Sequence, residues 1–154
     1  MATKKPHIMV AEGRFYAEIS DALFEGAERT LKKGGATFER FAVPGALEIA
    51  GAFRLAIEAQ RAGKLKKPFD GFLALGCIIR GETTHYETVC AESARALTEL
   101  GLQFGVCIGN GILTVENDEQ AWARARMTEK DKGGGAAEAV LALVAIRRKF
   151  GLPA

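Results

Sequence analysis

The sequence predicts an α/β fold in which a four-stranded parallel β-sheet carries helices on both faces, within one three-layer domain over residues 1–154. Short apolar runs alternate along the chain with longer segments whose apolar residues recur at helical spacing, and strands that alternate with helices indicate a parallel sheet. The longest apolar run, residues 72–79, has the continuous hydrophobicity of a central strand that is buried on both faces.

The first half of the chain contributes two predicted strands and two predicted helices. The first strand covers residues 7–11, and the helix after it ends at two lysines and two glycines, residues 32–35. A second strand is predicted at residues 38–43, and the helix that follows ends at Gly63. The apolar positions that mark these helices are Ile19, Leu23, Ala27 and Leu31 in the first and Ile49, Phe53 and Ile57 in the second.

The second half begins with the central strand at residues 72–79. A third helix should stop at Gly101, and a fourth strand is expected at residues 104–108. Two further helices, from about 118 to 127 and from about 135 to 150, complete the fold. The positions that mark the third helix are Val89, Ser93, Ala96 and Leu100.

Composition and charge argue against several classes of function. The chain has 21 basic and 19 acidic residues, a formal net charge of +2, which gives no reason to expect nucleic acid or a membrane surface as partner. No apolar stretch reaches transmembrane length, and none near the start is long enough for a signal peptide. The three cysteines lack paired spacing and the two histidines lack a metal-binding motif, so we expect a cytoplasmic protein without a metal site.

Ligands of parallel sheets bind beyond the carboxyl ends of the strands. This rule selects four loops, at residues 12–16, 44–48, 79–85 and 109–114. Each loop carries glycine together with polar or aromatic residues that a core does not need. We therefore expect the functional residues among them.

The loop at residues 79–85 is the most informative of the four. Gly81 and two threonines lie where a strand gives way to a helix, and free N–H groups at such a point, with the helix dipole, can hold an anion. Capping of the helix by Thr83 or Thr84 would explain the same residues. His85, one step inside that helix, could transfer protons near neutral pH or could be a surface histidine without a role. The residues alone leave both alternatives open.

Other candidates are similarly open. Glu48 could interact favourably with a helix N-terminus or accept hydrogen bonds from a polyol. Phe15 could stack on a flat heterocycle or anchor its loop on the core. Arg124 and Lys132 flank the turn between the last two helices, where basic residues ordinarily form a solvated surface.

Five short segments occur in a fixed order along nearly the whole chain. They are residues 13–15 (GRF), 43–49 (VPGALEI), 81–86 (GETTHY), 111–117 (GILTVEN) with 119–121 (EQA), and 131–133 (DKG). Together they resemble the lumazine synthase family. The resemblance implies a flavodoxin-like fold and the condensation of 5-amino-6-ribitylaminopyrimidinedione with 3,4-dihydroxy-2-butanone 4-phosphate, in riboflavin biosynthesis, without a metal or other cofactor.

The same resemblance implies a role for each matching residue. His85 would transfer protons. The residues that would bind the pyrimidine and its ribityl chain are Phe15, Ala46, Leu47, Glu48, Ile78, Ile79, Asn110 and Lys132. The residues that would bind phosphate are Gly81, Glu82, Thr83 and Arg124, with Glu82 contributing its N–H group.

The resemblance further implies a homopentamer, or two stacked pentamers, in which Asn110, Arg124 and Lys132 reach the neighbouring subunit's site. Tyr16 replaces the asparagine usual after the aromatic residue, and Asn110 stands where many members have phenylalanine. The turn at residues 125–132 lacks the glycines of capsid-forming members.

Two rival functions remain at this point. An archaeal-type riboflavin synthase would dismutate the lumazine product, but the segment from Gly81 to His85 favours the lumazine synthase. A flavin-binding or scaffold protein could keep the fold without the chemistry, but the presence of Glu48, His85 and Arg124 argues against it.

Overall fold

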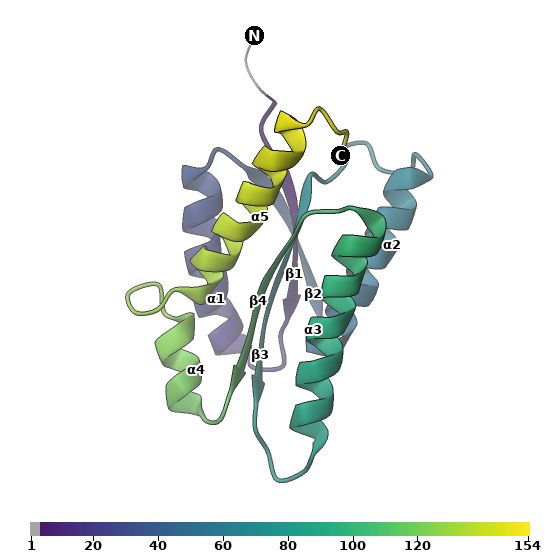
Figure 1. Ribbon diagram of the computed structural model, residues 1–154. Coiled ribbons are helices and arrows are strands. Elements are labelled where there is room, and N and C mark those ends of the chain that lie inside the picture. Colours follow the sequence, from purple (N-terminus) through teal and green to yellow (C-terminus); the bar gives the residue numbers. More distant parts are fainter. Residues whose placement is uncertain (1–3) are drawn as a thin grey trace.

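Strands and helices alternate along the chain in the computed structural model, which describes residues 4–154 (Figure 1). In chain order the elements are β1 (His7–Gly13), α1 (Ala17–Lys33), β2 (Thr37–Val43), the 3₁₀ helix η1 (Ala46–Glu48), α2 (Ile49–Arg61), β3 (Gly71–Ile79), α3 (His85–Phe104), β4 (Ile108–Val115), α4 (Asp118–Ala125) and α5 (Lys132–Lys149).

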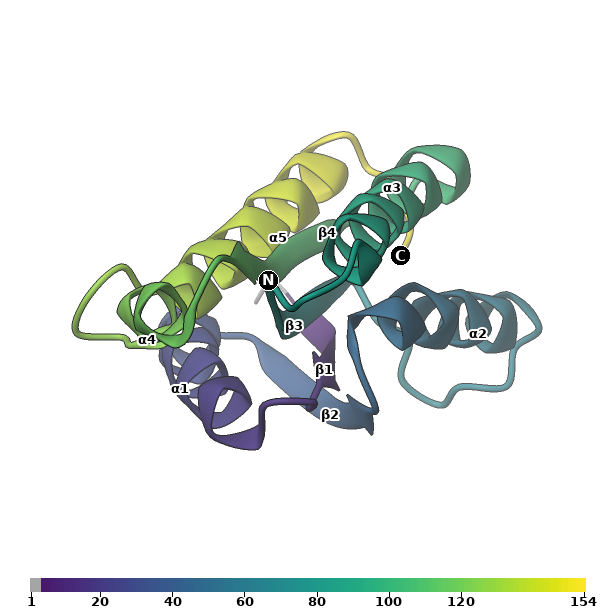
Figure 2. The same cartoon turned by 90° about the horizontal axis from the view of Figure 1, so that it is seen from below.

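The four strands form one parallel sheet with the order β2-β1-β3-β4. Helices α1, α4 and α5 cover one face, and α2 and α3 cover the other, which gives three layers (Figure 2). This strand order is that of a flavodoxin-like sheet, so the predicted fold class is confirmed. Within the described residues, no helix is both long enough and apolar enough to cross a bilayer.

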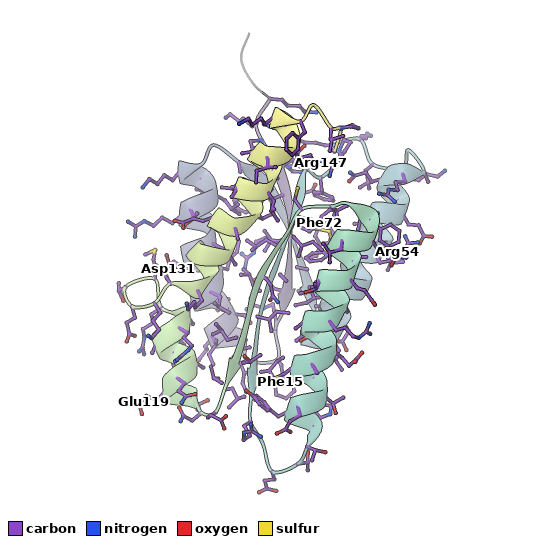
Figure 3. All side chains as sticks on the ribbon, in the orientation of Figure 1. Phe15, Arg54, Phe72, Glu119, Asp131 and Arg147 are labelled. Atoms are coloured by element: carbon purple, nitrogen blue, oxygen red, sulfur yellow. The ribbon has the colours of Figure 1, made fainter. Side chains whose placement is uncertain are left out.

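Strands β1 and β3 supply the core on both faces of the sheet. Ile8 and Val10 of β1 pack in the cluster that includes α1 and α5, whereas Met9 and Ala11 pack in the cluster that includes α2 and α3. Phe72, near the start of β3 and labelled in Figure 3, is only 1% exposed. Burial of alternate residues in opposite layers explains why the central strand is apolar at every position, as the sequence predicts.

The last strand lies further along the chain than predicted. Helix α3 continues through Gly101 to Phe104, Gly105 then adopts a left-handed conformation with φ of 62°, and β4 begins at Ile108. The expectations of a strand at residues 104–108 and of a loop at residues 109–114 are therefore wrong, because residues 109–114 lie within β4.

Close packing of α5 on β4 explains the glycines of this strand. A Cβ atom at Gly109 would lie 2.4 Å from the carbonyl oxygen of Ala136, and one at Gly111 would lie 3.0 Å from the Ala136 Cβ. These glycines serve the helix–sheet contact and do not form a turn.

Helix α5 begins at Lys132, earlier than the predicted start near residue 135. Asp131 precedes it in a left-handed conformation with φ of 45°, and its carboxylate accepts a hydrogen bond from the Gly134 N–H at 3.0 Å. A Cβ atom at Gly133 would lie 2.1 Å from the carbonyl oxygen of Leu23 in α1. Gly133 thus permits close approach of α5 to α1, and the glycines at the start of α5 do not break the helix.

Replacement of Gly133 by alanine should destabilise the protein by about 1–3 kcal/mol, because the added methyl group meets backbone that cannot move aside. Gly135→Ala is the matched control: nothing lies within 4 Å of its added Cβ, so it should stabilise the helix by roughly 0.5–1 kcal/mol. Urea unfolding of the two variants measures both effects. Equal changes in the two unfolding midpoints would contradict this account of the α1–α5 contact.

Candidate active site

The loops after β1 and β2 are in direct backbone contact. The Arg14 N–H donates to the Val43 carbonyl at 3.0 Å, and a Cβ atom at Gly13 would lie 2.8 Å from the carbonyl carbon of Gly45. Glycine at position 13 therefore allows the segment that carries Phe15 to lie against the turn that carries Glu48.

A cluster of ion pairs around the buried Glu12 holds the loop after β1. Glu12, 2% exposed, accepts hydrogen bonds from Arg40 at both carboxylate oxygens, at 2.8 and 2.9 Å, and from Arg14 at 3.0 Å. Arg14 also donates to Asp21 at 2.7 Å. A carboxylate buried this deeply needs such partners, because an unpaired buried charge is very costly. Arg14 directly precedes Phe15, so this cluster fixes the backbone from which the aromatic ring projects.

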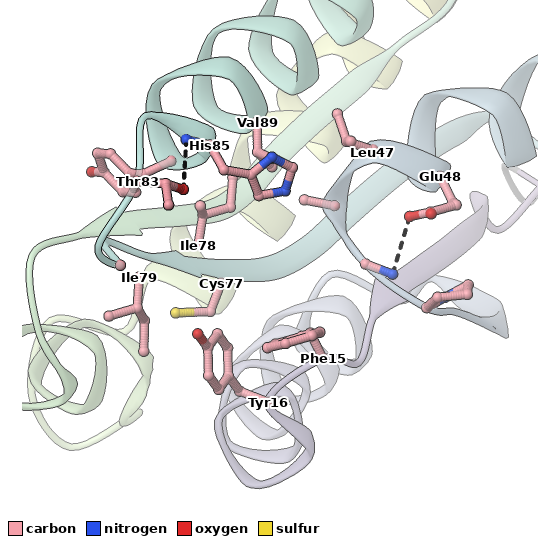
Figure 4. A pocket seen from close by; sticks show the side chains of 15 residues that line it. Phe15, Tyr16, Leu47, Glu48, Cys77, Ile78, Ile79, Thr83, His85 and Val89 are labelled. Atoms are coloured by element: carbon pink, nitrogen blue, oxygen red, sulfur yellow. Dashed lines mark hydrogen bonds between the residues drawn. The ribbon is translucent and has the colours of Figure 1, made fainter.

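A pocket of about 360 Å³ lies beyond the carboxyl ends of β1, β2 and β3 (Figure 4). This size falls in the usual range for small-molecule sites. Three of the four loops selected from the sequence contribute to it. Nine of the predicted site residues line it: Phe15, Ala46, Leu47, Glu48, Ile78, Ile79, Gly81, Thr83 and His85.

Phe15 forms one wall of the pocket. Its side chain is 75% exposed, and its ring meets that of Tyr16 edge to face, with the centroids 4.9 Å apart. A residue that anchors a loop on the core would be buried. The exposed ring face is instead suited to stacking on a planar ligand.

Glu48 lies across the pocket from the end of β3. One of its carboxylate oxygens accepts a hydrogen bond from the Gly45 N–H at 3.1 Å, as drawn in Figure 4. This bond closes the turn between β2 and α2 and fixes the direction of the side chain. The other oxygen has no hydrogen-bond partner among residues 4–154 and can accept from a ligand hydroxyl group.

The loop after β3 leads to the N-terminus of α3. The His85 N–H donates to the Thr83 hydroxyl oxygen at 3.3 Å, while the hydroxyl proton of Thr83 remains able to donate. Thr84, the N-cap residue of α3, makes no capping hydrogen bond through its side chain. The imidazole of His85 is exposed and points into the pocket (Figure 4). Gly81 borders open space, and Glu82 is exposed and does not line the pocket. The arrangement places helix-terminal N–H groups and a titratable ring on one wall.

Six further lining residues were not among the predicted site residues: Tyr16, Pro44, Gly45, Cys77, Tyr86 and Val89. The first three lie in loops that the sequence had selected, and two of the others also had a signal in the sequence. Val89 follows His85 by four positions and so shares its helix face, and Cys77 shares the side of β3 that Ile79 occupies.

Burial raises the pKa of two of these groups. It raises the pKa of the Cys77 thiol to about 12, so the thiol stays protonated and unreactive at neutral pH. Burial also raises the pKa of the Tyr16 hydroxyl, a group that is protonated at neutral pH and can donate a hydrogen bond.

Three predicted residues lie away from the pocket of the single chain. Asn110 is exposed on β4, where its side chain accepts a hydrogen bond from the Ile112 N–H at 3.0 Å. Arg124 of α4 donates to the Gln120 carbonyl at 3.1 Å, and Lys132 is exposed at the first turn of α5. The resemblance assigned all three to a neighbouring subunit's site, which one chain cannot contain.

Across the described range, 4–154, no group of three or more histidine, cysteine, aspartate or glutamate side chains is placed to hold a metal ion.

Comparison with known proteins gives one consistent result. The family model described as 6,7-dimethyl-8-ribityllumazine synthase matches residues 5–148. A protein of that name from Agrobacterium fabrum (strain C58 / ATCC 33970) is 51% identical over 147 residues, 96% of this chain and 98% of that protein. The 6,7-dimethyl-8-ribityllumazine synthase 1 of Rhizobium meliloti (strain 1021) is 51% identical, with 98% of each chain covered. The family model and these relatives match nearly the whole chain, so the chain belongs to the lumazine synthase family.

Proposed function

We propose that the protein condenses 5-amino-6-ribitylaminopyrimidinedione with 3,4-dihydroxy-2-butanone 4-phosphate to give 6,7-dimethyl-8-ribityllumazine, phosphate and water. One observation carries this proposal. A single pocket brings together an exposed aromatic face, a carboxylate with a free oxygen, and a helix N-terminus with a histidine beside it. These are the groups that a planar ring, a polyol and a phosphate ester would each need.

The pyrimidine would occupy the side of the pocket near Phe15. Its ring stacks on the exposed phenyl face, and its edge meets backbone groups of Ile78 and Ile79 at the end of β3. The ribityl chain extends over Ala46 and Leu47, where the free oxygen of Glu48 accepts from its hydroxyl groups.

The keto-phosphate would occupy the side of the pocket near α3. The N–H groups of Gly81, Glu82 and Thr83 hold the phosphate, helped by the dipole of the helix. The amine of the pyrimidine attacks the ketone and forms an imine with loss of water, and phosphate then leaves by elimination. The ribitylamino nitrogen attacks the carbonyl that this elimination creates in the four-carbon unit and closes the ring with loss of a second water. His85 relays the protons that these steps move. Much of the rate comes from holding the two substrates together.

The complete site would need a neighbouring subunit. The family assembles into oligomers. In the proposed pentamer, Arg124 of one subunit approaches the phosphate bound by the next, and Asn110 and Lys132 approach the pyrimidine. We also propose a cytoplasmic location, which the absence of disulfides among Cys77, Cys90 and Cys107 favours.

Mixing the two substrates with the protein and following the fluorescence of the lumazine product tests this function. Incubation with the lumazine alone tests the rival riboflavin synthase activity, which nothing in the family match supports. A protein that binds lumazine but converts neither substrate set would be the non-catalytic scaffold.

His85→Ala should lower turnover by about two orders of magnitude, the usual contribution of a general acid–base group. The free energy of unfolding should change little, because the imidazole is exposed and makes no hydrogen bond within residues 4–154. Steady-state kinetics and urea unfolding measure the two effects. Turnover at the wild-type rate would remove His85 from the mechanism, whereas rescue by imidazole buffer would support the relay.

Arg124→Ala should raise the Michaelis constant for the keto-phosphate and spare that for the pyrimidine. A charge-assisted contact contributes roughly 1.5–3 kcal/mol, which corresponds to about a ten- to hundredfold change. Arg126→Ala is the control, since this exposed arginine pairs with Glu129 in the turn and has no proposed role at the site. An equal rise for both substrates would indicate a damaged interface and contradict a specific phosphate contact.

The assembly should be a pentamer or two stacked pentamers, and not a shell of sixty subunits. Asp131 reaches a left-handed conformation without glycine, so the turn itself can form. It exposes Arg126, Glu129 and Lys130, however, and charged side chains resist burial between pentamers. Light scattering coupled to size exclusion should give five or ten chain masses, and a hollow particle of sixty chains would refute the argument.

A further inference from the structure

Arg80 connects the two ends of the loop that would bind phosphate. It follows β3 directly, and its guanidinium forms ion pairs with Glu116, at 2.6 Å between Nε and Oε2, and with Glu87. Its Cζ atom lies 4.4 Å from the centroid of the Tyr86 ring, and its N–H donates to the Val115 carbonyl at 2.9 Å. Arg80 therefore contacts the end of β4 and the first turn of α3 at once.

The segment enclosed by these contacts has few other restraints. Residues 81–85 are all exposed, Gly81 borders open space, and the hydrogen bond between the His85 N–H and Thr83 is long. Tyr86, against which the guanidinium packs, lines the pocket. The placement of Gly81, Thr83 and His85 thus depends on what holds the ends of the loop.

We infer that Arg80 is a positioning residue, which holds the loop from Gly81 to Tyr86 in the shape that binds the keto-phosphate. The inference rests on the proposed phosphate role of that loop. Arg80 acts through the loop and does not serve as the phosphate-binding cation, because two carboxylates already neutralise its charge. Arg80 lowers the pKa of Glu87 by hydrogen bonding to it, so the pair stays charged at neutral pH and the restraint persists there.

Arg80→Met removes the charge and keeps an unbranched stem that can still pack on Tyr86. Arg95→Met is the matched control. Arg95 also bridges two glutamates, Glu92 and Glu99, but it does so along α3 and away from the pocket. Both variants should therefore unfold at similar urea concentrations, since exposed ion pairs contribute little to stability.

The two variants should differ in their Michaelis constants for the keto-phosphate. Arg80→Met should raise the Michaelis constant for the keto-phosphate about fivefold, the upper range for an exposed pair, and leave that for the pyrimidine unchanged. It should raise the inhibition constant of inorganic phosphate to the same degree. Glu87→Gln should act in the same direction, and Arg95→Met should match the wild type. An unchanged constant for the keto-phosphate, or an equal rise for both substrates, would overturn the inference.

Thr83→Val distinguishes a failure of this inference from a failure of the proposed function. If Thr83→Val raises the Michaelis constant for the keto-phosphate but Arg80→Met does not, the loop binds phosphate and Arg80 does not position it. If neither variant changes that constant, the proposed phosphate role of the loop is itself wrong, and the inference about Arg80 fails with it.

Discussion

Parallel pairing of β1 with both β2 and β3 is the constraint on which the rest of this structure depends. Parallel neighbours need a crossover helix between them, and each crossover returns the chain to the same edge of the sheet. The carboxyl ends of β1, β2 and β3 therefore lie side by side at one edge of the sheet. Phe15, Glu48 and His85, which lie far apart in the sequence, reach one pocket for this reason.

Several elements also approach one another closely through their backbones, at positions occupied by glycine. Gly13 allows the loops after β1 and β2 to lie in contact. Close packing of α5 on β4 requires Gly109 and Gly111, and its packing on α1 requires Gly133. Each of these positions would place a Cβ atom closer to its neighbours than ordinary packing allows. These glycines thus bring elements together, whereas Gly35, Gly63 and Gly105 adopt positive φ just after a helix ends.

Charged side chains near the pocket are paired in two places, one buried and one at the surface. Glu12, deep in the fold, is held by Arg14 and Arg40 and fixes the loop that presents Phe15. Arg80, at the surface, is matched by two glutamates around the loop that leads to His85. Arg14 and Arg80, the arginines within the pocket loops, are thereby engaged in ion pairs that hold those loops. The phosphate is left to helix-terminal N–H groups and, in the proposed oligomer, to Arg124 of the neighbouring subunit.

The sequence by itself determined the fold class, the buried central strand, and three of the four loops that could hold a ligand. These follow from local periodicity and from the position of polar residues after apolar runs, which a single segment already displays. Phe15, Glu48 and His85 could be proposed for the same reason, although the exposed face of Phe15 and the free oxygen of Glu48 had to be seen in the structure. Only the tertiary structure decided the bounds of β4 and α5. Gly109 and Gly133 have the local pattern of a turn or a helix break, yet they lie within a strand and a helix because Ala136 and Leu23, distant in the sequence, pack directly against them.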